Sequence, residues 1–238
     1  MSAGGSIGMV LDRALNMDLL DVALRVATEH GEAADARQLL TVALRDFVTP
    51  QEAENKTRKV LTRVWLLPPT NAQAMIRWGI NHQDEMADRR ALHFGALLAT
   101  FPFVGSIAAA VGRQIHIDGA ADRKSLRAFA RATFGEREFI DAGASKSLAT
   151  MRNLGLLDGP QDGPYQVADR LAVPPAFSSW FLHALALTRQ TESVRVAELS
   201  RAFELTGVAV EPTTSTYSLL DFHAENGSIV AVVRESVG

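Results

Sequence analysis

Along the first 120 residues, apolar side chains recur every three or four positions, which is the spacing of one face of an α-helix. Turn and cap residues divide this region into short helices. Gly31 and the pair Pro68 and Pro69 end two of them, and Thr49 with Pro50 begins another. The expected helices cover residues 10–30 with a break near Asn16, 35–47, 51–67, 71–80, 84–101 and 104–115. Their short connections predict a helical bundle.

Residues 91–112 form the most apolar stretch, with no Asp, Glu, Lys or Arg over 22 positions. That length would suffice for a membrane-spanning helix. Ala and Gly dominate the stretch, however, and Pro102 interrupts its middle, where a proline breaks a helix. We therefore expect two buried helices of a soluble bundle that meet at Phe101 and Pro102. Membrane attachment is the alternative.

Residues 122–167 follow the order helix, turn, helix, strand, turn, strand. In the first helix Leu126, Phe129, Ala130 and Phe134 share one face, and Gly135 ends it. The second helix carries a continuous apolar row: Ile140, Ala144, Leu148, Met151 and Leu154. A Gly- and Pro-rich turn at 158–164 then separates two short strand-like runs at 156–157 and 165–167. This order predicts a winged helix-turn-helix.

The second helix also has a polar side, which carries Ser145, Lys146, Thr150, Arg152 and Asn153. Short donors and long cations of this kind reach phosphates and base edges in a major groove. We therefore interpret these residues as candidate DNA contacts. The alternative is an ordinary solvated face on a winged helix that only holds proteins together.

Two further groups of cations are candidate phosphate contacts. Arg137 lies just before the second helix of the winged unit. Lys56, Lys59 and Arg63 are spaced three and four residues apart, so they form one basic stripe on the helix expected at 51–67. For this stripe a solvated helix face is an equally good explanation.

The remainder of the chain, residues 171–238, predicts a small α+β module. A Pro-containing linker at 172–175 precedes a helix that begins at Ser178 or Ser179, and a second helix is expected at 194–206. Two strand-like runs at 217–223 and 229–233 flank Asn226 and Gly227, a strong hairpin signal. The fold class is thus mainly α, with a helical bundle domain at 1–120, a winged helix-turn-helix at 121–170 and the α+β module at 171–238.

Composition narrows the possible functions. The chain has 238 residues, a formal net charge of −3 and no cysteine, which excludes disulfides, cysteine zinc sites and a thiol nucleophile. We expect a cytoplasmic protein, since the N-terminus lacks the pattern of a secretory signal. Only residues 122–168 are net positive, with seven basic and six acidic side chains. Any contact with nucleic acid must therefore use a local basic patch.

Catalytic motifs are missing from the sequence. The six histidines are scattered and none has the spacing of a zinc protease motif. The Gly-rich run at 4–8 lacks the lysine of a phosphate-binding loop, and no G-x-S-x-G elbow occurs. His93, in an apolar helix, is interpreted as a core histidine rather than a ligand. We expect no enzyme activity, no metal and no cofactor.

Three motifs carry a resemblance to a known family: NKTRKVL at 55–61, FPF at 101–103 and SLATMRNLGLL at 147–157. The stretch from about residue 54 to 157 resembles the BrxA family of BREX phage-defence systems. The resemblance implies a small, mostly helical protein that is linked to DNA binding and has no catalytic activity of its own.

These observations predict a non-enzymatic accessory protein that binds double-stranded DNA in a phage-defence (BREX-like) or other DNA-transaction complex. Its expected partners are duplex DNA and other protein subunits of such a complex, with no membrane. One alternative is a protein-interaction adaptor whose winged helix is a scaffold. Another is a winged-helix transcriptional regulator whose C-terminal module senses a signal.

Overall fold

The computed structural model describes residues 10–31, 33, 35–48 and 51–234. Its α-helices are α1 (Met17–His30), α2 (Ala36–Leu44), α3 (Gln51–Leu61), α4 (Thr70–Asn81), α5 (Arg89–Thr100), α6 (Pro102–Asp118), α7 (Arg123–Phe134), α8 (Glu138–Asn153) and α9 (Ser178–Arg189). A π-helical turn, η1 (Thr62–Leu66), continues α3, and 3-10 turns lie at η2 (Gln83–Glu85), η3 (Pro175–Phe177), η4 (Val196–Glu198) and η5 (Phe203–Leu205). The described chain is therefore mainly helical, as expected.

The strands are short and lie after residue 156. They are β1 (Leu157–Asp158), β2 (Gln166–Val167), β3 (Leu171–Ala172), β4 (Ser193–Arg195), β5 (Val208–Ala209), β6 (Leu220–Glu225) and β7 (Ser228–Val233). β1 pairs with β2 in antiparallel fashion, β3 pairs with β5 in parallel, and β4, β7 and β6 form an antiparallel sheet in that order. The β6–β7 hairpin turns at Asn226 and Gly227, as the sequence predicts.

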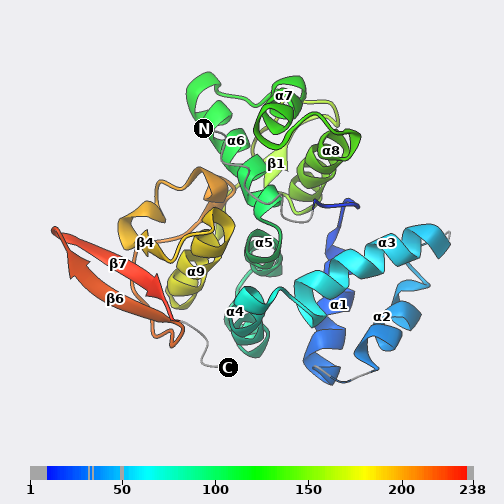
Figure 1. Ribbon diagram of the computed structural model, residues 1–238, viewed down its shortest axis with the longest axis horizontal. Coiled ribbons are helices and arrows are strands. Elements are labelled where there is room, and N and C mark those ends of the chain that lie inside the picture. Colours follow the sequence, from blue (N-terminus) through cyan, green and yellow to red (C-terminus); the bar gives the residue numbers. More distant parts are fainter. Residues whose placement is uncertain (1–9, 32, 34, 49–50, 235–238) are drawn as a thin grey trace.

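Three groups of elements surround α5, which lies at the centre of Figure 1. In that view α7, α8 and β1 lie above it, α1 to α3 lie to the right, and α9 with β4, β6 and β7 lies to the left. One hydrophobic core cluster includes buried side chains from all three groups. The buried core is therefore continuous across residues 120 and 170, where the sequence suggests domain boundaries.

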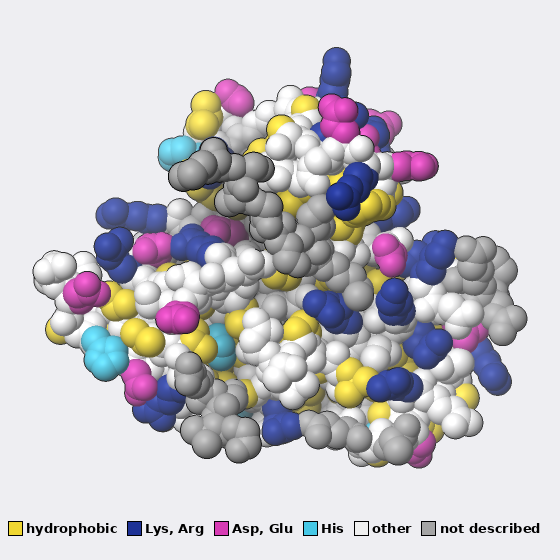
Figure 2. All heavy atoms as spheres, viewed as in Figure 1, with side chains coloured by type: hydrophobic (Ala, Val, Ile, Leu, Met, Phe, Trp, Pro, Cys, Tyr) yellow, Lys and Arg dark blue, Asp and Glu magenta, His cyan; other side chains and the backbone are white. Residues whose placement is uncertain are grey.

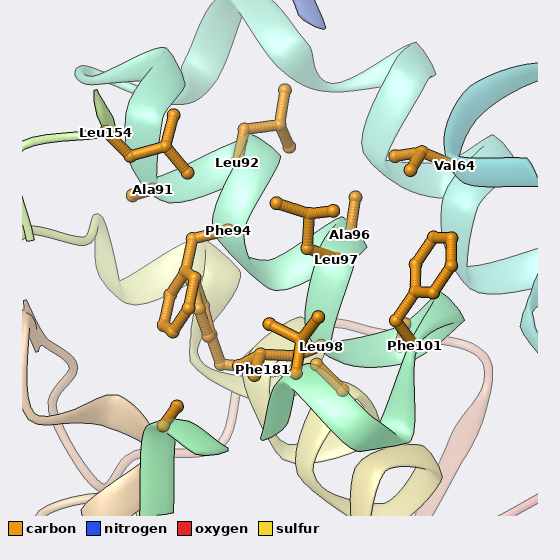
Figure 3. Close-up of a cluster of buried hydrophobic side chains, with 14 of the residues drawn as sticks. Val64, Ala91, Leu92, Phe94, Ala96, Leu97, Leu98, Phe101, Leu154 and Phe181 are labelled. Atoms are coloured by element: carbon orange, nitrogen blue, oxygen red, sulfur yellow. The ribbon is translucent and has the colours of Figure 1, made fainter. Parts of the chain in front are cut away.

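α5 is the central helix of this core because it has no polar face. Every residue from 91 to 100 is buried, and a helix that is apolar on all sides must be covered on all sides. Figure 3 shows its side chains pointing in different directions, toward Val64 of η1, Leu154 at the end of α8 and Phe181 of α9. α5 thus links all three groups.

α5 and α6 meet at Phe101 and Pro102, as expected for residues 91–112. Pro102 occupies the first turn of α6, where its missing N–H costs nothing, and the two helix axes are bent by 115°. Among the described helices, none is by itself long and apolar enough to cross a membrane. The bent pair passes such a test by length and composition only.

Trp180 connects α9 to α4 and α5. Its indole ring is fully buried and its Nε1 donates to the carbonyl of Met75 at 3.0 Å. The ring lies against two glycines. A Cβ built on Gly95 would lie 2.1 Å from Trp180 Cζ3, and one built on Gly79 would lie 3.2 Å from the ring. The ring fits between the two helices because both positions lack a side chain.

The prediction of a helix at 194–206 is wrong. Residues 193–195 form strand β4, and η4 and η5 are separate 3-10 turns. Val194 and Val196 are buried while Ser193 and Arg195 are exposed, which is the period of a strand. The expected helix at 84–101 also begins later, at Arg89, because the Asp88 carboxylate caps it by accepting from the Arg90 N–H at 2.9 Å.

Candidate nucleic-acid interface

α7 and α8 are two consecutive helices joined by a tight turn. The Asp122 carboxylate caps α7 by accepting from the Ser125 N–H at 2.8 Å. Gly135, with φ +95°, ends α7 in a conformation that favours glycine, and α8 begins at Glu138. The predicted apolar row of α8 is buried throughout: Ile140, Ala144, Leu148, Met151 and Leu154. The remaining sides of α8 are available to other elements or to solvent.

A small β-ribbon lies beside these helices. β1 and β2 form it, and residue 121, between α6 and α7, joins it through a bridge to Tyr165 with two backbone hydrogen bonds of 2.8 Å. The phenol of Tyr165 is buried and donates to the carbonyl of Gln161 at 2.8 Å. The ribbon loop, residues 159–165, is therefore attached to the start of α7.

Four cations form a row on α7: Arg123, Lys124, Arg127 and Arg131. The carboxylate of Asp141 in α8 accepts from Arg127 Nη2 at 2.7 Å and from Arg131 Nη1 at 3.2 Å. The Asp141 side chain is 17% exposed, whereas the side chains of the two arginines are 41% and 43% exposed. The ion pairs therefore fix both guanidinium groups beside α8 and leave much of their surface open.

Arg123 connects α7 to α8 and to the ribbon loop. Its Nη2 donates to Ser145 Oγ at 3.3 Å, and its Nη1 donates to the Asp162 carboxylate and, at 3.4 Å, to the Gln161 carbonyl. Ser145, a predicted DNA contact, thus lies directly beside a cation that is not among the predicted contacts. Asp162 partly neutralises that cation.

Arg152 belongs to the same region. Burial raises the pKa of the Tyr165 phenol, and the charges of Arg123 and Arg152 act against that rise. An open hollow of about 340 Å³ lies beside the basic row, and it is lined by Asp122, Arg123, Lys124, Arg127, Arg131 and Asp162. The cations that line this hollow all belong to α7.

Two residues predicted as DNA contacts on α8 bond the backbone of Leu15, and of the two Thr150 is buried whereas Asn153 stays exposed. Thr150 is 1% exposed, and its Oγ1 accepts from the Leu15 N–H at 3.0 Å. The Asn153 amide Nδ2 donates to the Leu15 carbonyl at 2.9 Å. Both side chains hold a segment that is more than 130 residues away in sequence. Lys146 and Arg152 are half-exposed.

The basic stripe predicted at 56–63 is divided in the structure. Arg63 lies in η1, where its Nε donates to the Thr100 carbonyl at the end of α5 at 3.1 Å and its guanidinium lies over the Phe101 ring. Burial lowers the pKa of Arg63. It therefore stabilises a helix C-terminus instead of facing a phosphate, which corrects our expectation. Lys56 and Lys59 are exposed on α3.

Arg137, the remaining predicted contact, is exposed at the start of α8, with its guanidinium 5.8 Å from the centre of the Phe139 ring. Figure 2 shows Lys and Arg side chains mixed with acidic ones over the α7 and α8 group, and a larger gathering of cations over α1 to α3. The α7 row is not among the predicted contacts, although Arg123, Arg127 and Arg131 recur every four residues, a spacing that marks one helix face.

Two histidines are buried. His93 Nε2 lies 3.1 Å from the Asp21 carboxylate, and His183 Nδ1 lies 2.9 Å from the Tyr217 hydroxyl. Burial lowers the pKa of both imidazoles, to about 4 for His183. Within the described part of the chain, no three His, Asp or Glu side chains are grouped so that they could hold a metal ion.

His183 makes the stability of the fold depend on pH. Its pKa is about 4 in the folded chain and 6.5 when unfolded, so the unfolded state takes up the proton first as the pH falls. We expect the free energy of unfolding to decrease by about 1 kcal/mol between pH 7.5 and 5.5 through this group. Urea unfolding at both pH values checks this, because His183→Gln should show a smaller decrease than the parent. An equal decrease in both proteins would contradict the assignment.

Comparison with family models, with curated proteins and with solved structures finds no match to this chain.

Proposed function

We propose that residues 121–170, together with α6, act as a winged helix-turn-helix and that the protein binds double-stranded DNA through α7, α8 and the adjoining ribbon. The observation that carries the proposal is the group of cations Arg123, Lys124, Arg127, Arg131, Lys146 and Arg152 on two consecutive helices beside a ribbon. Cations supply the sequence-independent part of duplex affinity by neutralising phosphates. The order α6, bridge residue 121, α7, α8, β1, β2 supports the winged-helix assignment.

In this proposal α8 enters the major groove. Its outward positions Ala142 and Ala149 are small, so the helix backbone can approach the base edges closely. Lys146 and Arg152 reach bases or phosphates from the same side, and the α7 row holds the neighbouring phosphates. The protein performs no chemistry on the DNA and serves as an accessory factor of a defence complex of the BREX type or another DNA-transaction complex.

A protein-interaction adaptor is the second candidate, and one observation favours it. Asp141 and Asp162 pair with three of the four α7 cations, so the net positive charge of the face is small. A protein partner with mixed charges would suit such a surface. Binding of duplex DNA that weakens steeply with salt separates the two candidates.

The test is a salt titration of binding to a fluorescent duplex of about 20 base pairs between 50 and 200 mM salt. Each phosphate contact contributes roughly −0.9 to the slope of log K against log salt, so six cations predict a slope of about −5. Lys146→Ala and Arg152→Ala should each flatten the slope by about 0.9, because neither side chain belongs to the buried row of α8.

Arg201→Ala is the matched control, since Arg201 is an exposed arginine of the C-terminal module. It should leave affinity and slope unchanged. If the folded parent fails to bind duplex at 50 mM salt, the proposal is wrong and the adaptor takes its place. The proposal is also wrong if the parent binds duplex but neither Lys146→Ala nor Arg152→Ala differs from the control in affinity or salt slope.

A further inference from the structure

Residues 10–15 form a segment, here named the N-terminal strap, that lies against α8. Val10 occupies the space beside Gly143, where an added Cβ would lie 1.8 Å from Val10 Cγ1. Leu15 is held through its N–H by Thr150 and through its carbonyl by Asn153. Val10 lies beside residue 143, and Leu15 lies beside residues 150–153. Because both sequence numbers increase in the same direction, the strap runs parallel to α8. Figure 1 shows this dark-blue segment between α8 and α3.

The strap and α7 lie on opposite flanks of α8. At 100° per residue, Asp141 and Ser145, which contact α7, point roughly 140–180° away from Gly143 and Thr150, which contact the strap. The positions between these flanks are the outward ones that include Ala142, Lys146 and Ala149. The exposed strip of α8 is therefore bordered by α7 on one side and by the strap on the other.

Arg13 is the cation of the strap. It lies between the two anchored residues, so it runs alongside the middle of α8, and its side chain is half-exposed. Among the residues that the structure describes, none forms a hydrogen bond or ion pair with this side chain. The described residues therefore leave the guanidinium of Arg13 without a partner.

We propose that Arg13 contacts a DNA phosphate on the strand opposite to the one that the α7 cations hold, so that α8 sits in the groove between two cationic borders. A helix with its side chains is about 10–12 Å across and the major groove is about 12 Å wide, so phosphates line both flanks of an inserted helix. This inference rests on the proposed function. It makes the strap part of the binding surface in addition to its packing role.

The experiment repeats the salt titration with Arg13→Gln, which keeps the side-chain stem, and with Arg13→Lys, which keeps the charge. Arg13→Gln should flatten the slope by about 0.9 and weaken binding about 8-fold at 0.1 M salt. Arg13→Lys should keep the parental slope. Arg25→Gln, an exposed arginine of α1 and the matched control, should behave like the parent. Melting temperatures of all variants should stay near that of the parent, because Arg13 anchors nothing.

The outcomes separate the two proposals. If the parent binds duplex and Arg13→Gln keeps the parental affinity and slope, Arg13 contacts no phosphate and this inference is wrong. The proposed function then still depends on Lys146 and Arg152. If the parent does not bind duplex at 50 mM salt, both proposals are overturned. A loss in Arg13→Lys as large as in Arg13→Gln would also reject a phosphate contact.

Discussion

Replacing Gly95 with alanine is expected to lower the free energy of unfolding by about 3 kcal/mol, although alanine favours helices over glycine. The added Cβ would lie 2.1 Å from Trp180 Cζ3 and 2.6 Å from Cη2, and a ring buried on all sides cannot move away. Insertions into a packed core usually cost about 1–3 kcal/mol, and this distance is short enough for the upper end. Thermal or urea unfolding measures the loss.

The same contact predicts that the effect of Gly95→Ala on the free energy of unfolding changes sign when Trp180 is replaced as well. Trp180→Phe removes the outer ring atoms that would meet the new methyl group. In that variant Gly95→Ala should be neutral or stabilising by up to about 1 kcal/mol, which is the helix preference of alanine over glycine. A double-mutant cycle therefore isolates the contact. If Gly95→Ala costs the same in both backgrounds, the ring does not limit this position.

Neutralising the paired charges between α7 and α8 is expected to weaken duplex binding roughly 50-fold at 0.1 M salt. The variant carries Arg127→Gln, Arg131→Gln and Asp141→Asn, so it removes two phosphate contacts and should flatten the salt slope by about 1.8. Removing all three charges together leaves no half-buried carboxylate without a partner. Fluorescence anisotropy against the labelled duplex measures both quantities.

The single change Asp141→Asn is the matched comparison. It breaks the same two ion pairs, so any loss of stability is shared, but it raises the positive charge of the face by one. We expect several-fold tighter binding, opposite in sign to the triple variant. If both proteins lose affinity equally, the region acts through its packing and the cations do not hold phosphates.

Local patterns in the sequence predicted much of this fold. Pro102 specifies the bend between α5 and α6, because a proline ends one helix and suits the first turn of the next. The apolar row of α8 and the Asn226–Gly227 turn of the β6–β7 hairpin were also correctly predicted. In each case, residues within a few positions of one another determine the structure.

The incorrect predictions concern residues whose partners lie far away in the sequence. Thr150 and Asn153 look like free polar side chains on a helix face, and only the folded chain brings Leu15 to them. Arg63 fits a basic stripe by spacing, but the π-helical turn and the end of α5 give it another partner. For 194–206, Val196, Leu199 and Phe203 have helical spacing, and pairing of β4 with β7 overrides it. The spacing of residues in a single sequence does not show which distant residues they will contact.

The strap also affects the order in which the molecule is completed during synthesis. Leu15 leaves the ribosome 135 residues before Thr150, its hydrogen-bond partner. At about 5–20 residues per second, that delay is roughly 7–27 s. During this time α8 has not yet been made, so the apolar side chains of the strap cannot pack against it. The outer border of α8 therefore cannot close before residue 150 has been made.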